Sequence, residues 1–196
     1  MPRPPNPEVR TRLLFIGRTL VHSRGFNGSG IQDITGAAQV PKGSFYNYFA
    51  SKESFVADII EEYWQSIEHR HGPLLYDARL KPLIRVEKFF AALSQDHAKQ
   101  GFTLGCLIGN LSLELANTSG ETRLKLIEVV GKWEQALAAC VREAQERNEL
   151  DGDANPIQLA AMMIEAYEGA VMRGKLDRNS DALDRFSKIA LPKLIR

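Results

Sequence analysis

A polar segment between residues 29 and 52, SGIQDITGAAQVPKGSFYNYFASK, holds the residue types that point most clearly to chemistry. From Gln39 to Lys52 it carries ammonium, hydroxyl, phenol and amide groups and no acid. Such side chains bind phosphate oxygens and base edges, and a glycine near a helix N-terminus leaves amides exposed to a phosphate. The segment is therefore expected to contact nucleic acid through Ser29, Lys42, Gly43, Ser44, Tyr46, Asn47, Tyr48 and Lys52.

The spacing of apolar residues in this segment predicts two short helices that meet across a tight turn. Pro41 would interrupt one long helix, and the small residues of the run 36–38 let two backbones approach each other. The second helix would begin at about Pro41 or Lys42. Its Phe45 and Phe49 are expected in the core, which leaves the polar residues between them exposed, as in a recognition helix.

Charge is unevenly distributed along the chain. Residues 1–52 carry seven Lys or Arg against two acids, a net charge of +5, whereas residues 53–196 carry eighteen against twenty-two, a net charge of −4. A basic N-terminal segment before a mildly acidic remainder of the chain favours an anionic partner, with nucleic acid as the first candidate and an acidic membrane as the second.

Helical periodicity runs through most of the 196 residues. Apolar residues recur every three or four positions from Val9 to Leu20, and similar stripes follow to the end of the chain with no comparable period of two. The pattern predicts an all-α fold of about nine helices. A three-helix helix-turn-helix domain is expected over residues 1–52, and a helical ligand-binding and dimerisation domain over 53–196. Helix breaks are expected at 71–73, 100–101, 117–120 and 151–153.

Several residues of the second domain could line a small-molecule pocket. Glu165, Glu168 and Arg173 interrupt an otherwise apolar helix. Of these, Glu165 and Arg173 are candidate pocket residues, together with Tyr167 of the same helix and Trp133 of another apolar stripe. Aromatic residues at helical spacing are commonly core residues, and charges on helices are commonly solvated. For each of these residues the sequence leaves pocket and ordinary positions equally open.

Cys106 begins the helical run 107–116 and has two possible roles. The positive N-terminus of a helix favours the thiolate, and hence reaction with oxidants or electrophiles. Its apolar neighbours favour the opposite outcome, a buried and inert thiol. Cys140 lies on the stripe of Trp133 and is expected to be a buried hydrophobe.

Other functional classes find little support in the sequence. The chain contains no GxSxG, GxxxxGK or HExxH motif, and its two cysteines form no CxxC pair. We therefore expect no enzyme activity, catalytic residue, cofactor or metal site. The charged, prolyl N-terminus and the lack of a long apolar run predict a cytoplasmic protein without a membrane partner. A helical signalling or interaction module without specific DNA binding remains the alternative.

The order helix, GF, then IxDIxxAAxVPKGSFYxYFxSKExF resembles the N-terminal domain of TetR-family transcriptional regulators, over about residues 8–60. The resemblance implies that Lys42, Gly43, Ser44, Tyr46 and Asn47 face bases and phosphates, while Tyr48 and Lys52 hold the DNA backbone. The family often has Ser or Thr at both positions before the Ile of the first short helix. Here the pair is Ser29-Gly30, so only Ser29 remains to cap that helix or touch phosphate.

The segment 53–196 resembles the electrophile- and acrylate-responsive NemR/AcuR-like subgroup of that family, through the stretches FTLGCLIGNLSLELA and YEGAVMRGKL. This resemblance implies a homodimer formed by the last two helices, about 155–174 and 180–194, and a role for Cys106 in sensing. The expected function is that of a DNA-binding regulator, a repressor released from a palindromic operator by a small-molecule or electrophile inducer.

Overall fold

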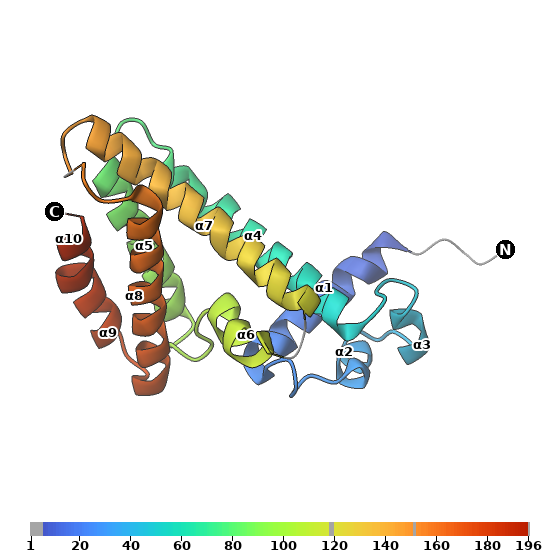
Figure 1. The fold of residues 1–196 in the computed structure, drawn as a ribbon. Helices are drawn as coiled ribbons and strands as arrows, with labels where there is room; N and C mark the ends of the chain where they lie inside the picture. Colours follow the sequence, from blue (N-terminus) through green and yellow to red (C-terminus); the bar gives the residue numbers. More distant parts are fainter. Residues whose placement is uncertain (1–5, 118–119, 151, 196) are drawn as a thin grey trace. The chain divides into compact units, whose positions relative to one another are not determined.

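The computed structural model describes residues 6–117, 120–150 and 152–195, and these residues form helices and connecting turns with no strand (Figure 1). The predicted all-α class is confirmed. The segment 181–194 is helical throughout, with one π-helical turn in its middle. The elements are α1 (Pro7–Arg24), α2 (Ile31–Ala37), α3 (Lys42–Phe45), α4 (Lys52–Leu75), α5 (Pro82–Lys99), α6 (Leu107–Leu115), α7 (Gly120–Glu146), α8 (Pro156–Asp177), α9 (Asp181–Arg185), η1 (Phe186–Ala190) and α10 (Leu191–Leu194).

Contacts group the chain into two compact units. The first consists of residues 1–64 and 107–129, and the second of residues 65–106 and 130–196. The helix-turn-helix segment thus shares its unit with α6 and the start of α7. A functional boundary near residue 52 stays a prediction, because these two units are defined by which residues pack together and not by what the residues do.

Helix ends follow the local chemistry of the sequence. The Asn6 side chain accepts a hydrogen bond from the Glu8 amide at the start of α1, and Gly25, with φ of 78°, ends that helix. Asn155 caps α8 in the same way, immediately before Pro156.

One predicted break is wrong. The chain was expected to leave the helix at 71–73, but α4 continues through Pro73 to Leu75. A proline so close to a helix end removes only one of the last hydrogen bonds, so the final turn can accommodate it. The break at 100–101 is confirmed, since α5 ends at Lys99. Residues 118, 119 and 151, within the other two predicted breaks, lie outside the described residues.

The core of the first unit is aromatic. The rings of Phe45, Phe49 and Phe55 lie with centroids 4.7 to 5.2 Å apart, and all three side chains are buried. A Cβ at Gly17 would collide with the Phe55 ring, so only glycine lets α1 approach α4 this closely. This packing confirms the core role predicted for Phe45 and Phe49.

The second unit combines an aromatic centre with a buried ion pair. The Tyr167 ring lies 5.0 Å from that of Phe90 and 5.3 Å from that of Phe186. Arg85, almost fully buried, donates to the Glu143 carboxylate from two nitrogens, at 2.7 and 3.2 Å. The two hydrogen bonds to the Glu143 carboxylate offset the free-energy cost of burying the Arg85 guanidinium.

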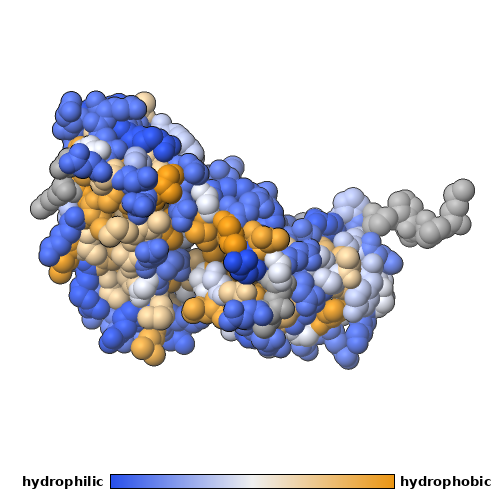
Figure 2. All heavy atoms as spheres, viewed as in Figure 1, coloured by the Kyte–Doolittle hydropathy of each residue, from blue (hydrophilic) through white to orange (hydrophobic). Residues whose placement is uncertain are grey.

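Apolar side chains also gather on the outside of the second unit, over α8 and the helical segment that follows it (Figure 2). The helices of the described residues include none that is long and apolar enough to cross a membrane.

Candidate nucleic-acid interface and effector site

The exposed polar face predicted after Pro41 is present in the structure. Lys42, Gly43 and Asn47 are exposed, Tyr46 is 56% exposed, and Ser44 is partly buried. The helix itself is shorter than expected. α3 ends at Phe45, and the residues after it continue as hydrogen-bonded turns. A Cβ at Gly43 would meet nothing within 4 Å, so this part of the face is sterically open.

Ser29 does not belong to that exposed face. Its side chain is fully buried and its hydroxyl donates to the Gly25 carbonyl at 2.8 Å. The residue that caps α2 is Gly30, whose amide donates to the Asp33 carboxylate at 3.0 Å. The expectation that Ser29 caps α2 is therefore wrong, because its hydroxyl is already used to close the preceding turn.

Two other predicted phosphate contacts make internal bonds. The Tyr48 hydroxyl accepts from the Asn6 amide at 3.1 Å, which ties the start of α1 to the turn after α3. The Lys52 ammonium donates to the Phe26 carbonyl at 2.5 Å and lies 4.0 Å from the centre of the Phe26 ring. Burial lowers the pKa of Lys52, while the charges of Glu114 and Glu53 act in the opposite direction. Contact of Tyr48 and Lys52 with DNA stays a prediction.

Glu114, which sequence reasoning missed, holds the loop between α1 and α2. Its two carboxylate oxygens accept from the amides of Phe26 and Asn27, at 2.8 and 2.7 Å. A Cβ at Gly25 would lie 2.8 Å from the same carboxylate, so glycine is needed there for space as well as for its positive φ. A detectable signal existed, since Glu114 is the single acid in the apolar run of α6.

Three of the predicted effector-site residues come together in the second unit. Cys106, Trp133 and Tyr167 are each at most 5% exposed, and the Trp133 and Tyr167 rings meet edge to face at 6.4 Å. Burial raises the pKa of Tyr167 well above its ordinary value, and a hydrogen bond with Ser94 partly opposes this. Cys106 directly precedes the first residue of α6.

The other two predicted residues are elsewhere. Glu165 and Arg173 are exposed, and Arg173 pairs with Asp177 one turn further along α8 at 2.6 Å. Their charges interrupt the apolar pattern because they lie on the outer side of the helix. Neither joins Cys106, Trp133 and Tyr167. Arg173 instead lines a shallow surface groove beside α8, and an effector role for Glu165 and Arg173 stays a prediction.

Glu168 is the acid that does join this buried group. Its carboxylate accepts a hydrogen bond from the Cys106 thiol, while its Oε1 atom is shielded from solvent and has no hydrogen-bond partner. Burial raises the pKa of this carboxyl to about 7, and the Cys106 hydrogen bond opposes the shift. In the sequence Glu168 is one of the charges that interrupt this apolar helix, but the predicted site residues include only its exposed neighbour Glu165.

Cys140 behaves differently from Cys106. Its thiol is buried and donates to the Leu75 carbonyl at 3.3 Å. Burial raises its pKa to about 11. A thiol with such a pKa is almost entirely protonated near neutral pH and reacts slowly, in agreement with the inert role expected for it.

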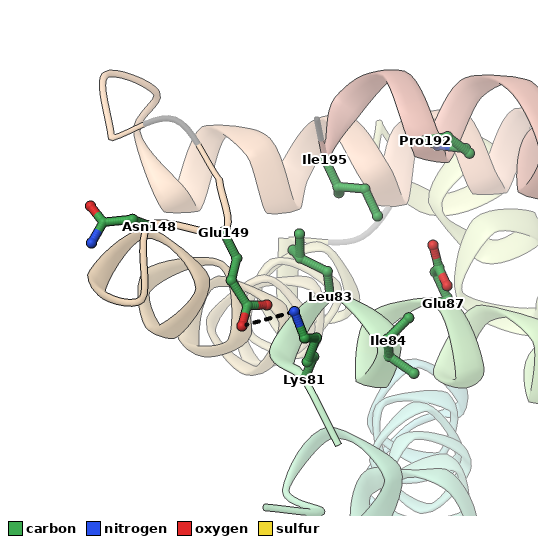
Figure 3. A pocket seen from close by; sticks show the side chains of 8 residues that line it. All are labelled: Lys81, Leu83, Ile84, Glu87, Asn148, Glu149, Pro192 and Ile195. Atoms are coloured by element: carbon green, nitrogen blue, oxygen red, sulfur yellow. Dashed lines mark ion pairs between the residues drawn. The ribbon is translucent and has the colours of Figure 1, made fainter. Parts of the chain in front are cut away.

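A surface depression of about 500 Å³ in the second unit contains none of the predicted effector residues (Figure 3). An ion pair of 3.6 Å between Lys81 and Glu149 crosses it. Across residues 6–117, 120–150 and 152–195, no three His, Cys, Asp or Glu side chains gather closely enough to hold a metal ion.

Comparison with known proteins identifies the family. Residues 16–59 match the model of bacterial regulatory proteins of the tetR family, and residues 82–190 match that of the tetracyclin repressor-like C-terminal domain. The chain belongs to the TetR family. The helix-turn-helix face and the helical body therefore correspond to the two parts expected of such a regulator.

Relatives place the chain in the predicted subgroup of the TetR family. The repressor DhaR of Mycobacterium sp. strain GP1 is 37% identical over 95% of this chain and 92% of its own length. The regulator AcuR of Cereibacter sphaeroides is 35% identical over 90% of this chain and 80% of its own. The crystal structure of reduced NemR from Escherichia coli has a TM-score of 0.83 at 27% identity, and covers 96% of this chain and 97% of that one.

The chain is accordingly a DNA-binding transcriptional regulator. Regulators of this family bind operator DNA, function as dimers and respond to small-molecule effectors. The alternative of a helical interaction module without specific DNA binding is not favoured. The named relatives are regulators and not enzymes.

Replacement of Glu114 by alanine is expected to weaken operator binding about tenfold, on the order of 1.4 kcal/mol, because the Phe26 and Asn27 amides lose their shared acceptor. The salt dependence of binding should not change, since no phosphate contact is removed. Fluorescence anisotropy with operator DNA at several salt concentrations measures both quantities. Glu121→Ala removes an exposed carboxylate from the same unit and serves as the control. Equal affinity of both variants and wild type would contradict the role of Glu114.

Proposed function

We propose that the chain is a repressor whose homodimer binds a palindromic operator and leaves it when a small molecule or electrophile acts at the buried Cys106 group. The observation that carries this proposal is the position of α6. This helix starts directly after Cys106, and its Glu114 holds the loop that precedes α2. A change at Cys106 therefore has a short covalent and hydrogen-bonded route to the helix-turn-helix segment.

The exposed face of Lys42, Tyr46 and Asn47 supports DNA reading in two ways. An asparagine amide can pair with an adenine edge, whereas a lysine ammonium binds guanine or phosphate. Two such faces fit successive major grooves when they are about 34–36 Å apart, or a multiple of that distance. Because the partner is chromosomal DNA, we propose that the protein acts in the cytoplasm.

Alanine variants should separate the two modes of DNA contact. We expect Lys42→Ala to lower affinity for all sequences and to reduce the salt slope by about one unit, through loss of a phosphate contact. Asn47→Ala should instead change the preferred bases with little change of slope. Binding-site selection followed by titration at two salt concentrations tests both. Lys88→Ala, at an exposed lysine of α5, is the control. A wild-type protein without sequence preference would refute operator reading.

Release from DNA by an effector requires only a shift between the DNA-bound and released forms of the protein, and no catalysis. An effector that binds or modifies the released form better than the DNA-bound form shifts the equilibrium by its difference in affinity. Cys106 and its buried neighbours Trp133 and Tyr167 are the group we assign to this step. One solved relative, NemR, is described as the reduced form of that protein, which supports the choice of a cysteine for this step.

Cys106→Ser decides between a covalent and a reversible effector. We expect methylglyoxal, a quinone or hypochlorite to release operator DNA from the wild-type protein and from Cys140→Ser, but not from Cys106→Ser, because only the first two keep the sensing thiol. Release can be followed by anisotropy, with modified cysteines identified by mass spectrometry. If Cys106→Ser responds like wild type, Cys106 is a packing residue and the effector binds reversibly.

The homodimer is proposed to form through α8 and the segment 181–194. These helices pack side by side (Figure 1). Small residues of α8 line a shallow groove of about 340 Å³ between them. Large apolar side chains project from the same helices into solvent: Met162, Met172, Leu176 and Ile189. Two helices from each subunit would bury these side chains in a four-helix bundle.

A charge placed on this face should separate the subunits. Ile189 is 54% exposed, and Ile189→Asp is expected to give a monomer at low micromolar concentration, because an aspartate would be desolvated in the bundle. Sedimentation velocity measures the mass of the variant in solution. Its affinity for operator DNA should fall as the dimer is lost. Leu113→Asp, at an 85% exposed position of α6, is the control and should stay dimeric. A dimeric Ile189→Asp variant would place the interface elsewhere.

A further inference from the structure

The turn between α2 and α3 carries an exposed glutamine in an unfavourable backbone conformation. Gln39 has a φ of 54°, in the left-handed region, and is exposed to solvent. Two hydrogen bonds fix this conformation. The Gln39 amide donates to the Gly36 carbonyl at 3.1 Å, and the Val40 amide donates to the Thr35 carbonyl at 2.9 Å. This is a Schellman motif, in which glycine has the lowest conformational cost at the left-handed position.

The end of α7 offers a comparison within the same chain. Asn148 has a φ of 55° in the same motif: its amide donates to the Gln145 carbonyl, and the Glu149 amide donates to the Ala144 carbonyl. Asparagine tolerates the left-handed region better than most residues with a Cβ, so its own chemistry explains its place there. Glutamine has no such preference. The backbone bonds end α2 whichever side chain Gln39 carries, so the use of that side chain lies elsewhere.

Gly36 is a helical residue that packing does not require to be glycine. It lies within α2 and is exposed, and a Cβ at this position would meet nothing within 4 Å. Gly17 shows the opposite case, since a Cβ there would collide with the Phe55 ring. Glycine inside a helix is less stable than alanine. A glycine in open space therefore fits a surface on which a body from outside the chain comes close.

The chemistry around the turn suits an anionic body. The sequence from Ile34 to Lys52 contains no acid, and Lys42, three residues after Gln39, is exposed. A primary amide donates hydrogen bonds to phosphate oxygens, and backbone without side chains lets a sugar–phosphate chain approach closely. Duplex DNA is the anionic partner that the chain binds as a TetR-family regulator.

We propose that this turn is a further DNA contact site, where the Gln39 side-chain amide donates to a phosphate oxygen and Gly36 leaves room for the sugar–phosphate backbone. Neither residue belongs to the set predicted from the sequence to meet DNA. The contact positions α3 on the duplex and reads no base, because a phosphate carries no sequence information. The inference rests on DNA binding and is independent of the role proposed for Cys106.

Replacement of Gln39 by glycine separates DNA contact from folding. We expect Gln39→Gly to bind DNA about fivefold more weakly, through loss of one hydrogen bond, while its thermal unfolding temperature does not fall, because glycine suits the left-handed position. Fluorescence anisotropy is measured with a duplex obtained by binding-site selection on the wild-type protein. Asn148→Gly makes the same backbone change in the same motif of the second unit, and its affinity should equal that of wild type.

Charged replacements of Gln39 test the phosphate assignment. Gln39→Lys should bind more tightly at low salt and steepen the salt slope by about one unit, because it adds a cation beside a phosphate. Gln39→Glu should bind at least tenfold more weakly than wild type. The preferred operator sequence should be the same for both variants and for wild type, since the contact reads no base.

Gly36→Ala tests the space for the DNA backbone. We expect its unfolding temperature to rise by about 2 °C, because alanine favours the helix, and its affinity to fall about tenfold, because the methyl group occupies that space. A variant that is more stable and binds less tightly cannot owe its weaker binding to a damaged fold.

The outcomes distinguish this contact from operator reading as a whole. If Gln39→Gly and Gly36→Ala bind like wild type, the turn does not touch DNA and the inference is overturned, while the reading face stands. If Gln39→Lys leaves the salt slope unchanged, or if either charged variant prefers other bases, the phosphate assignment is overturned. If wild type binds no duplex, DNA binding fails and this contact fails with it.

Discussion

The bond from Glu114 to the amides of Phe26 and Asn27 is the constraint on which the DNA-reading segment depends. It joins residues 87 and 88 positions apart and fixes the loop from which α2 begins. Lys52 closes the same loop from another helix, through the Phe26 carbonyl and ring. Because the carboxylate and the ammonium satisfy backbone groups here, the loop needs no secondary structure of its own.

Buried polar groups have different surroundings in the two compact units. In the first, the buried Ser29 hydroxyl has a hydrogen-bond partner, and Lys42, Tyr46 and Asn47, which are expected to meet DNA, are exposed. In the second, the Arg85 guanidinium is paired with Glu143, whereas one oxygen of the Glu168 carboxylate is shielded from solvent without a hydrogen-bond partner. Such an unpaired oxygen lowers the stability of the fold.

Regulation in this scheme requires little movement. α6 carries Glu114 near one end and follows Cys106 at the other, so a displaced or rotated α6 alters the geometry of two hydrogen bonds. Operator binding by a dimer depends on the position of both recognition segments at once. Under the proposed function, a displacement of this one helix changes DNA occupancy when the effector distinguishes the two states.

The sequence by itself determined the helical class, the helix break at 100–101 and the exposed face of Lys42, Tyr46 and Asn47, because periodicity, turn-forming residues and the absence of acids are local properties. Only the tertiary structure decided which acids act at a distance. Glu114 and Glu168 have ordinary positions in the sequence, and neither Phe26–Asn27 nor Cys106 indicates its partner. Hydrogen bonds between residues more than 60 positions apart depend on how helices pack, and a local pattern does not encode that packing. For the same reason exposed Glu165 and Arg173 could not be distinguished from buried Glu168, since all three interrupt the same apolar helix.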